Sequence, residues 1–129
     1  MKNTLLAALL ILALGQLSHF GLPWWSLAII AGLIAAWLCK SAWQAFAAGL
    51  LGGSILWIIA AWLLDSANES VLSGKVGQLF QGASSMQLLW LTGFMGGLIA
   101  ALGALTGKLG KDMLIKPSRK GYLQEKRRR

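Results

Sequence analysis

Two long apolar segments constrain the fold of this chain more than any other feature. They extend over residues 42–64 and 85–107. Each slightly exceeds the roughly 20 residues that a helix needs to cross a hydrocarbon core of about 30 Å. Two further apolar segments precede them, at about 3–20 and 23–39. We therefore expect an all-α integral membrane protein whose four transmembrane helices form one domain over residues 1–107.

The composition agrees with this class and leaves little material for catalysis. Hydrophobic residues make up 57% of the chain, and 12 basic residues stand against 4 acidic ones, which is untypical of a soluble domain. The single cysteine, Cys39, excludes an internal disulfide, and one histidine with so few acids leaves no obvious metal site. No nucleophile has a plausible base, and no phosphate-binding loop is present. We expect no catalytic residue, cofactor or metal, and hence no enzyme.

Serine residues mark three expected helix starts. In a capping box, a serine accepts a hydrogen bond from the backbone three residues on, and a Glu or Gln at that position reaches back. The pattern occurs at Ser41 and Gln44, at Ser66 and Glu69, and at Ser84 and Gln87. The middle pair predicts a fifth, shorter helix over about 67–81, with one narrow apolar face that suits an external membrane surface.

The basic residues predict an orientation. With a cytoplasmic N-terminus, Lys2, Lys40 and the nine basic residues of segment 108–129 lie inside, and only Lys75 lies outside. This distribution follows the positive-inside rule. It predicts a multi-pass membrane protein with both termini in the cytoplasm. Of the tryptophans that we place, Trp57 is the exception, because it falls near mid-membrane rather than at an interface.

The N-terminus has a competing interpretation. Lys2, a short apolar run and a small-residue site before Gln16 resemble a signal peptide. Cleavage after residue 15 would leave three spans and an external N-terminus. The sequence alone leaves this alternative open.

Glycines recur in a similar pattern in the two long segments. GLLGGSILW occupies residues 49–57, and GFMGGLIAA occupies residues 93–101. The hydrophobic effect does not drive apolar helices together within lipid. Helix pairs in membranes are instead usually held by close packing at small residues, which let the backbones approach. We expect an antiparallel, closely packed pair, with a stripe of small residues on the second segment continuing to Gly107. The alternative is a flexible pair that lines a path for a small solute or lipid. The expected packing residues are Gly49, Gly52, Gly53, Gly93, Gly96, Gly97, Ala100 and Ala104.

Two polar side chains are expected at the outer membrane face. His19 ends the first segment and Asp65 ends the third, at a similar expected depth. Their pairing would suit proton-linked transport, since ionisable groups within membranes are often functional. At an interface reached by water, however, solvation or helix capping explains both.

The C-terminal segment 108–129 is expected to be a basic cytoplasmic tail. Anionic lipid of the inner leaflet attracts such segments by about 1 kcal/mol for each nearby Lys or Arg. An acidic protein partner fits the charge equally well. Nucleic acid is not favoured, because Tyr122 is the only aromatic residue available for stacking. The expected contact residues are Lys116, Arg119, Lys120, Lys126, Arg127, Arg128 and Arg129.

One stretch is similar to a known group of proteins. WIIAAWLLDSANESVLSGKVGQLF at 57–80, PWW at 23–25 and LTGFMGGLIAALGALTG at 91–107 resemble an uncharacterised family of small four-span bacterial inner-membrane proteins. The resemblance implies the four-span layout and a bacterial origin. It supplies no activity and no functional residues.

The expected function is non-catalytic. A small membrane protein without a site for chemistry is best interpreted as a structural or accessory subunit that associates with itself or with a larger membrane complex. The alternative is a subunit of a small oligomeric transporter or channel for a small solute or lipid. The sequence specifies no substrate, partner or oligomeric state.

Overall fold

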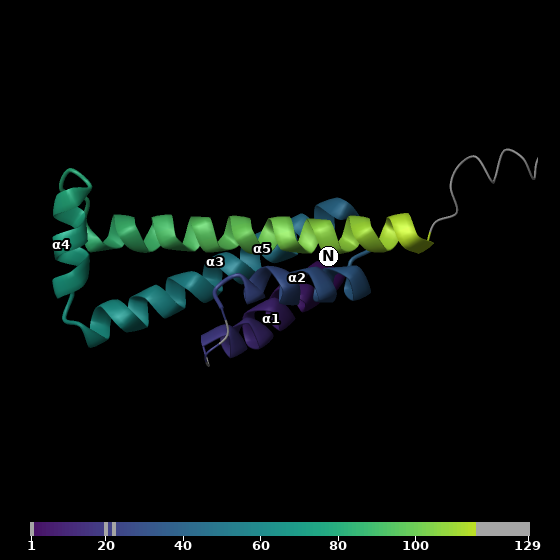
Figure 1. Cartoon of the computed structure of the whole chain (residues 1–129), viewed down its shortest axis with the longest axis horizontal. Helices are drawn as coiled ribbons and strands as arrows, with labels where there is room; N and C mark the ends of the chain where they lie inside the picture. The colour runs from purple at the N-terminus through teal and green to yellow at the C-terminus, as the bar shows by residue number, and fades with distance from the viewer. Residues whose placement is uncertain (1, 20, 22, 116–129) are drawn as a thin grey trace, which may run out of the picture.

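The protein is all-helical over the residues that the computed structural model describes, which are 2–19, 21 and 23–115 (Figure 1). Two helices, α3 and α5, are long and apolar enough to cross a membrane by length and composition, and α1 and α2 are shorter apolar helices. The described elements are α1 (Lys2–Gly15), a 3-10 turn η1 (Gln16–His19), α2 (Ser26–Leu38), α3 (Ala42–Ala67), α4 (Val71–Leu79) and α5 (Ser85–Ile115).

The long helices α3 and α5 form an antiparallel pair, and α4 crosses the end where the chain turns from one to the other (Figure 1). The shorter helices pack on this pair, α1 mainly against α3 and α2 mainly against α5. An amide hydrogen bond from Asn3 Nδ2 to the Leu38 carbonyl oxygen, 3.3 Å long, joins the start of α1 to the end of α2. Chain direction therefore alternates through α1, α2, α3 and α5.

Two of the three predicted capping boxes are confirmed. At the start of α3, Ser41 Oγ accepts from the Gln44 backbone N–H at 3.3 Å, and Gln44 Oε1 accepts from the Lys40 N–H at 3.2 Å. At the start of α5, Ser84 and Gln87 exchange reciprocal hydrogen bonds of 2.9 and 3.3 Å. These bonds satisfy N–H groups that have no partner within the helix.

The third capping box is wrong. Ser66 lies inside α3, which continues to Ala67, and α4 begins only at Val71. The corner between them is made by residues with positive φ, including Ser70 at +57°. The Ser70 hydroxyl donates to Asp65 Oδ2 at 2.9 Å, so this serine reaches back to the end of α3 instead of capping α4.

Helix α5 continues eight residues beyond its expected end at residue 107 and reaches Ile115. The first residue of the expected tail, Lys108, is therefore helical, and it is only 6% exposed. Its ammonium contacts Asp112 Oδ1, one turn further on, at 2.5 Å. This partner compensates part of the cost of burying a charge.

The α1–α2 hairpin is shorter than the pair on which it packs. A Cβ added to Gly15, at the end of α1, would lie 2.8 Å from Leu56 Cδ2 on α3. Asp65 follows Leu56 by nine residues, or about 13 Å of helix at 1.5 Å per residue. Figure 1 shows the hairpin turn short of the corner between α3 and α4.

Two glycines near α4 provide a matched test of backbone conformation. Gly82 has φ of +87°, whereas Gly74 is inside α4, and a Cβ at either position would meet nothing within 4 Å. We expect Gly82→Ala to destabilise the α4–α5 corner by about 1 kcal/mol, because a Cβ is strained at positive φ. Gly74→Ala should stabilise α4 by about 1 kcal/mol. Amide hydrogen exchange within α4 measures both, and shifts in the same direction would contradict this account.

Candidate functional site

The most extensive helix contact is between α3 and α5. A Cβ added to Gly49 would lie 2.5 Å from the Ala100 carbonyl oxygen, and one added to Gly53 would lie 3.2 Å from the Gly97 Cα. Side chains larger than hydrogen do not fit at these positions without movement of a backbone. Glycine thus allows the two backbones to approach closely over more than one turn of each helix.

The other predicted packing residues have different neighbours. Gly93 lies against Ile58, and Gly96 lies against the Trp57 side chain, which accounts for a tryptophan in mid-helix. Gly52 faces α1 rather than α5, since its added Cβ would lie 2.7 Å from the Ala8 carbonyl oxygen. Ala100 and Ala104 are both completely buried in the core.

A second glycine contact, which the sequence analysis missed, joins α2 to α5. A Cβ on Gly32 would lie 3.0 Å from the Gly103 carbonyl oxygen and 3.7 Å from the Gly107 Cα. The sequence predicts Gly107 on the stripe facing α3, but Gly107 lies against Gly32 of α2. The signal was present in the sequence, because Gly103 and Gly107 are four residues apart, as are Ala28 and Gly32.

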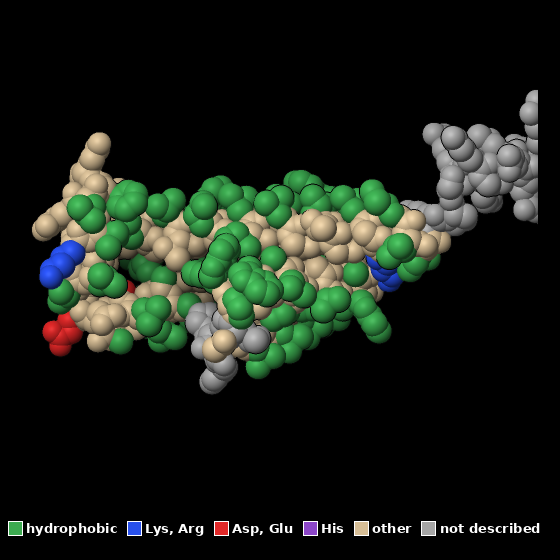
Figure 2. Space-filling model, viewed as in Figure 1, with side chains coloured by type: hydrophobic (Ala, Val, Ile, Leu, Met, Phe, Trp, Pro, Cys, Tyr) green, Lys and Arg blue, Asp and Glu red, His purple; other side chains and the backbone are tan. Residues whose placement is uncertain are grey.

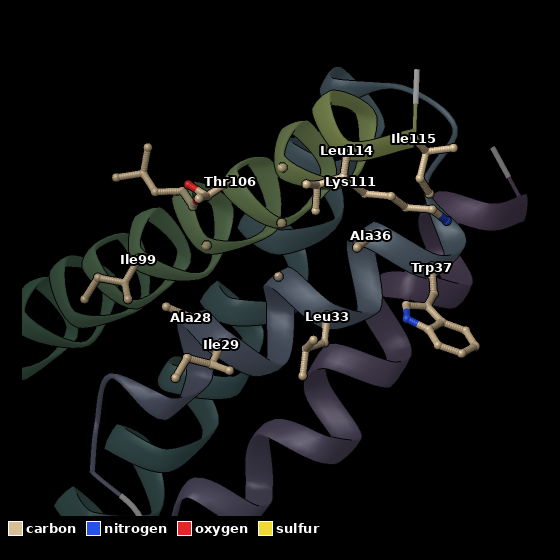
Figure 3. A pocket seen from close by; sticks show the side chains of 15 residues that line it. Ala28, Ile29, Leu33, Ala36, Trp37, Ile99, Thr106, Lys111, Leu114 and Ile115 are labelled. Atoms are coloured by element: carbon tan, nitrogen blue, oxygen red, sulfur yellow. The ribbon is translucent and has the colours of Figure 1, made fainter. Parts of the chain in front are cut away.

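A groove of about 1120 Å³ lies between α2 and α5, beside this contact (Figure 3). Its described lining is apolar except for Thr106 and Lys111. The Thr106 hydroxyl donates to the Leu102 carbonyl oxygen at 2.8 Å, so its own helix satisfies it. Lys111 is the single charged residue of the lining, and Figure 3 shows its side chain pointing toward the C-terminal end of α2, where Trp37 lies. The groove suits an apolar molecule with one anionic end.

A second cavity, of about 370 Å³, lies at the opposite end of the bundle, between α3, α4 and α5. Its lining combines apolar side chains with Asp65, Asn68, Ser73, Ser85 and Thr92. These polar groups have partners on their own or adjacent elements. For example, the Ser73 and Ser85 hydroxyls are 2.8 Å apart, and Thr92 Oγ1 donates to the Leu88 carbonyl oxygen at 2.8 Å. Of these bonds, the Ser73–Ser85 pair joins α4 to the start of α5.

The remaining predicted site residues are only partly described. Asp65 accepts a hydrogen bond from Ser70, while the His19 side chain lies outside the described residues, so their pairing stays a prediction. The same holds for the predicted tail contacts. Those outside the described residues are Lys116, Arg119, Lys120, Lys126, Arg127, Arg128 and Arg129.

Within the described part of the chain, no three His, Cys, Asp or Glu side chains lie close enough together to hold a metal ion. Cys39 is buried, with 5% of its surface exposed, at the end of α2. The two cavities and the helix contacts are therefore the features from which a function can be argued.

Comparison with known proteins adds no relationship. Neither protein-family models, nor curated proteins, nor solved structures give a match to this chain. Any functional proposal thus depends on the geometry and charge described above.

Gly49 and Gly110 give a matched test of the α3–α5 contact. A Cβ at Gly49 would meet the α5 backbone, whereas one at Gly110, on α5, would meet nothing within 4 Å. We expect Gly49→Ala to lower the free energy of unfolding by about 1–3 kcal/mol through overpacking. Gly110→Ala should be neutral or stabilising by up to about 1 kcal/mol, because alanine favours the helix. Thermal unfolding of the purified protein measures both variants, and equal stabilities would show that Gly49 is not a close contact.

Proposed function

We propose that the protein is a small integral protein of the bacterial inner membrane with a non-catalytic, structural or accessory role. The observation that carries the proposal is the position of the charges. All eight charged residues of the described part lie near the two ends of the bundle. From its start at Ala42 to Asp65, α3 rises about 35 Å without a charge, which exceeds the roughly 30 Å of a hydrocarbon core.

The surface between these ends supports the same proposal. Large hydrophobic side chains are exposed on every long helix, for example Leu51 at 48%, Leu63 at 56% and Leu102 at 58%. On the face in Figure 2, hydrophobic side chains cover the length of the bundle, and charged atoms are confined to its ends. Soluble monomers rarely expose contiguous apolar surfaces of such extent.

The charges at the two ends also favour one orientation. Lys40 and Lys108 lie at the end where α3 begins and α5 ends, and the basic residues of 116–129 come next in the sequence. The opposite end carries Asp65, Glu69 and Lys75. By the positive-inside rule, the first end is cytoplasmic, and both termini are therefore cytoplasmic.

In this proposal α3 and α5 cross the membrane completely, and the α1–α2 hairpin enters from the cytoplasmic side. Helices of 14 and 13 residues rise only about 20 Å each. The four-span layout therefore needs residues 23–25, which precede α2, to reach the outer surface through local thinning of the bilayer. A shallower turn would leave the hairpin within the membrane, with both of its ends cytoplasmic.

The tightly packed interior favours an accessory role over transport by a single copy. Glycine and alanine bring the α3 and α5 backbones together, which leaves no polar path between those two helices. The alternative, a transporter or channel subunit, would therefore need a path formed by several copies. The apolar groove between α2 and α5 would suit a lipid better than a polar solute in that case.

Cysteine labelling tests the proposed orientation. In a Cys39→Ala background, we introduce single cysteines by Gln78→Cys in α4, Ser118→Cys in the basic segment and Trp24→Cys in the hairpin turn. A membrane-impermeant thiol reagent added to intact cells should label residue 78 at once and residue 118 only after lysis. Residue 24 should label more slowly than residue 78, because the hairpin turn does not reach as far toward the outer surface as α4 does.

Two outcomes separate the possibilities. Labelling of residues 78 and 118 from the same side would overturn the proposed membrane orientation. Labelling of residue 24 as fast as residue 78 would favour four complete spans, and its protection in intact cells would favour a hairpin within the membrane.

Purification in mild detergent tests the accessory role. A stoichiometric membrane protein that co-elutes with the full-length chain, and that is lost when Lys126 to Arg129 are all replaced by Gln, would support it. A homogeneous oligomer without other proteins, able to carry a solute or lipid across vesicles, would favour the transporter alternative instead.

A further inference from the structure

We propose that the groove between α2 and α5 binds one anionic phospholipid of the cytoplasmic leaflet. The proposal rests on the membrane location proposed above. It is carried by three features of the groove, which are its direction, its apolar lining and the position of its one charge.

The groove runs along the helices rather than across them. Its lining on α5 extends from Ile99 to Ile115, or about 24 Å of helix, and on α2 from Ala28 to Trp37. In a protein whose helices cross the bilayer, such a groove lies parallel to the acyl chains. The surrounding side chains leave a space of about 1120 Å³ unfilled, and in a bilayer acyl chains would occupy this space.

The charge lies at the end where a phosphate would be found. Lys111 is near the C-terminal end of α5, level with the proposed cytoplasmic surface, and Lys40 lies at the same end of the bundle. The neighbouring Lys108 is already paired with Asp112, whereas Lys111 points along the groove toward Trp37 (Figure 3). A lysine placed there favours a negative headgroup over a zwitterionic one.

The rim of the groove favours a flexible occupant over a second helix. Close helix pairs need small residues at their interface, and in this groove Gly32, Gly103 and Gly107 already serve the α2–α5 contact. The outer rim instead carries bulky exposed side chains, Leu33 at 61% and Trp37 at 83%. Acyl chains adapt to such an uneven surface more readily than a helix does.

Lipid titration of the purified full-length protein tests the proposal. Phosphatidylglycerol and phosphatidylcholine with the same acyl chains are added separately in detergent, and native mass spectrometry counts the bound lipid. We expect one molecule of phosphatidylglycerol to bind about fivefold more tightly than phosphatidylcholine. Lys111→Gln should remove this preference, while the control Lys40→Gln, at the same end but outside the groove lining, should retain it.

Filling the groove tests its apolar part. Gly110 lines the groove, and a Cβ there would meet nothing within 4 Å, so Gly110→Trp should fold and occupy the acyl site. We expect it to weaken binding of both lipids about tenfold. Leu33→Trp, on the opposite wall, gives the same measurement if Gly110→Trp fails to fold.

Several results would overturn the proposal. They are equal binding of the two lipids, equal effects of Lys111→Gln and Lys40→Gln, or unchanged lipid binding in both tryptophan variants. A dimer that Gly110→Trp converts to monomer, and that phosphatidylglycerol does not dissociate, would assign the groove to a second copy. If cysteine labelling upholds the orientation while the lipid preference is absent, the lipid proposal alone fails.

Discussion

The close approach of the α3 and α5 backbones determines the arrangement of the remaining helices. It depends on hydrogen atoms at Gly49 and Gly53, because a Cβ at either position would meet the backbone or the Ala100 side chain of α5. With α3 held on one face of α5, helix α2 packs on another face through Gly32 and its partners. Helix α1 then fills the remaining side of α3. In an apolar environment, where water exclusion does not drive association, such contacts supply much of the packing energy.

Regular local signals made much of the helical fold predictable. Apolar length located α3 and α5, and the serine–glutamine pairs at their N-termini formed the expected capping bonds. The prediction at Ser66 was wrong because a capping box is only one of the hydrogen-bond patterns open to a serine. Here α3 continues past Ser66, and Ser70 bonds to Asp65 at the end of α3. Lys108 was assigned to a solvated tail because sequence pattern alone does not indicate that Asp112, one turn later, pairs with a buried ammonium.

The candidate site was less predictable than the fold. Small residues on α5 form two contact faces, and spacing alone does not tell which partner helix each face receives, so Gly107 was assigned to α3. The groove could not be predicted at all, because it arises from the side chains that two helices leave between them after packing. The tail contacts at 116–129 and the His19–Asp65 pair stay predictions, because the side chains of 116–129 and of His19 lie outside the described residues.

The contact between α2 and α5 joins parts of the chain that are made at very different times. Gly32 and Gly103 are 71 residues apart in the sequence. At a synthesis rate of about 5–20 residues per second, α2 emerges roughly 4–14 seconds before the segment of α5 that covers it. During this interval the glycine face of α2 has no partner from its own chain. The first hairpin therefore completes its packing only when the last helix arrives, which makes α5 the element that closes the fold.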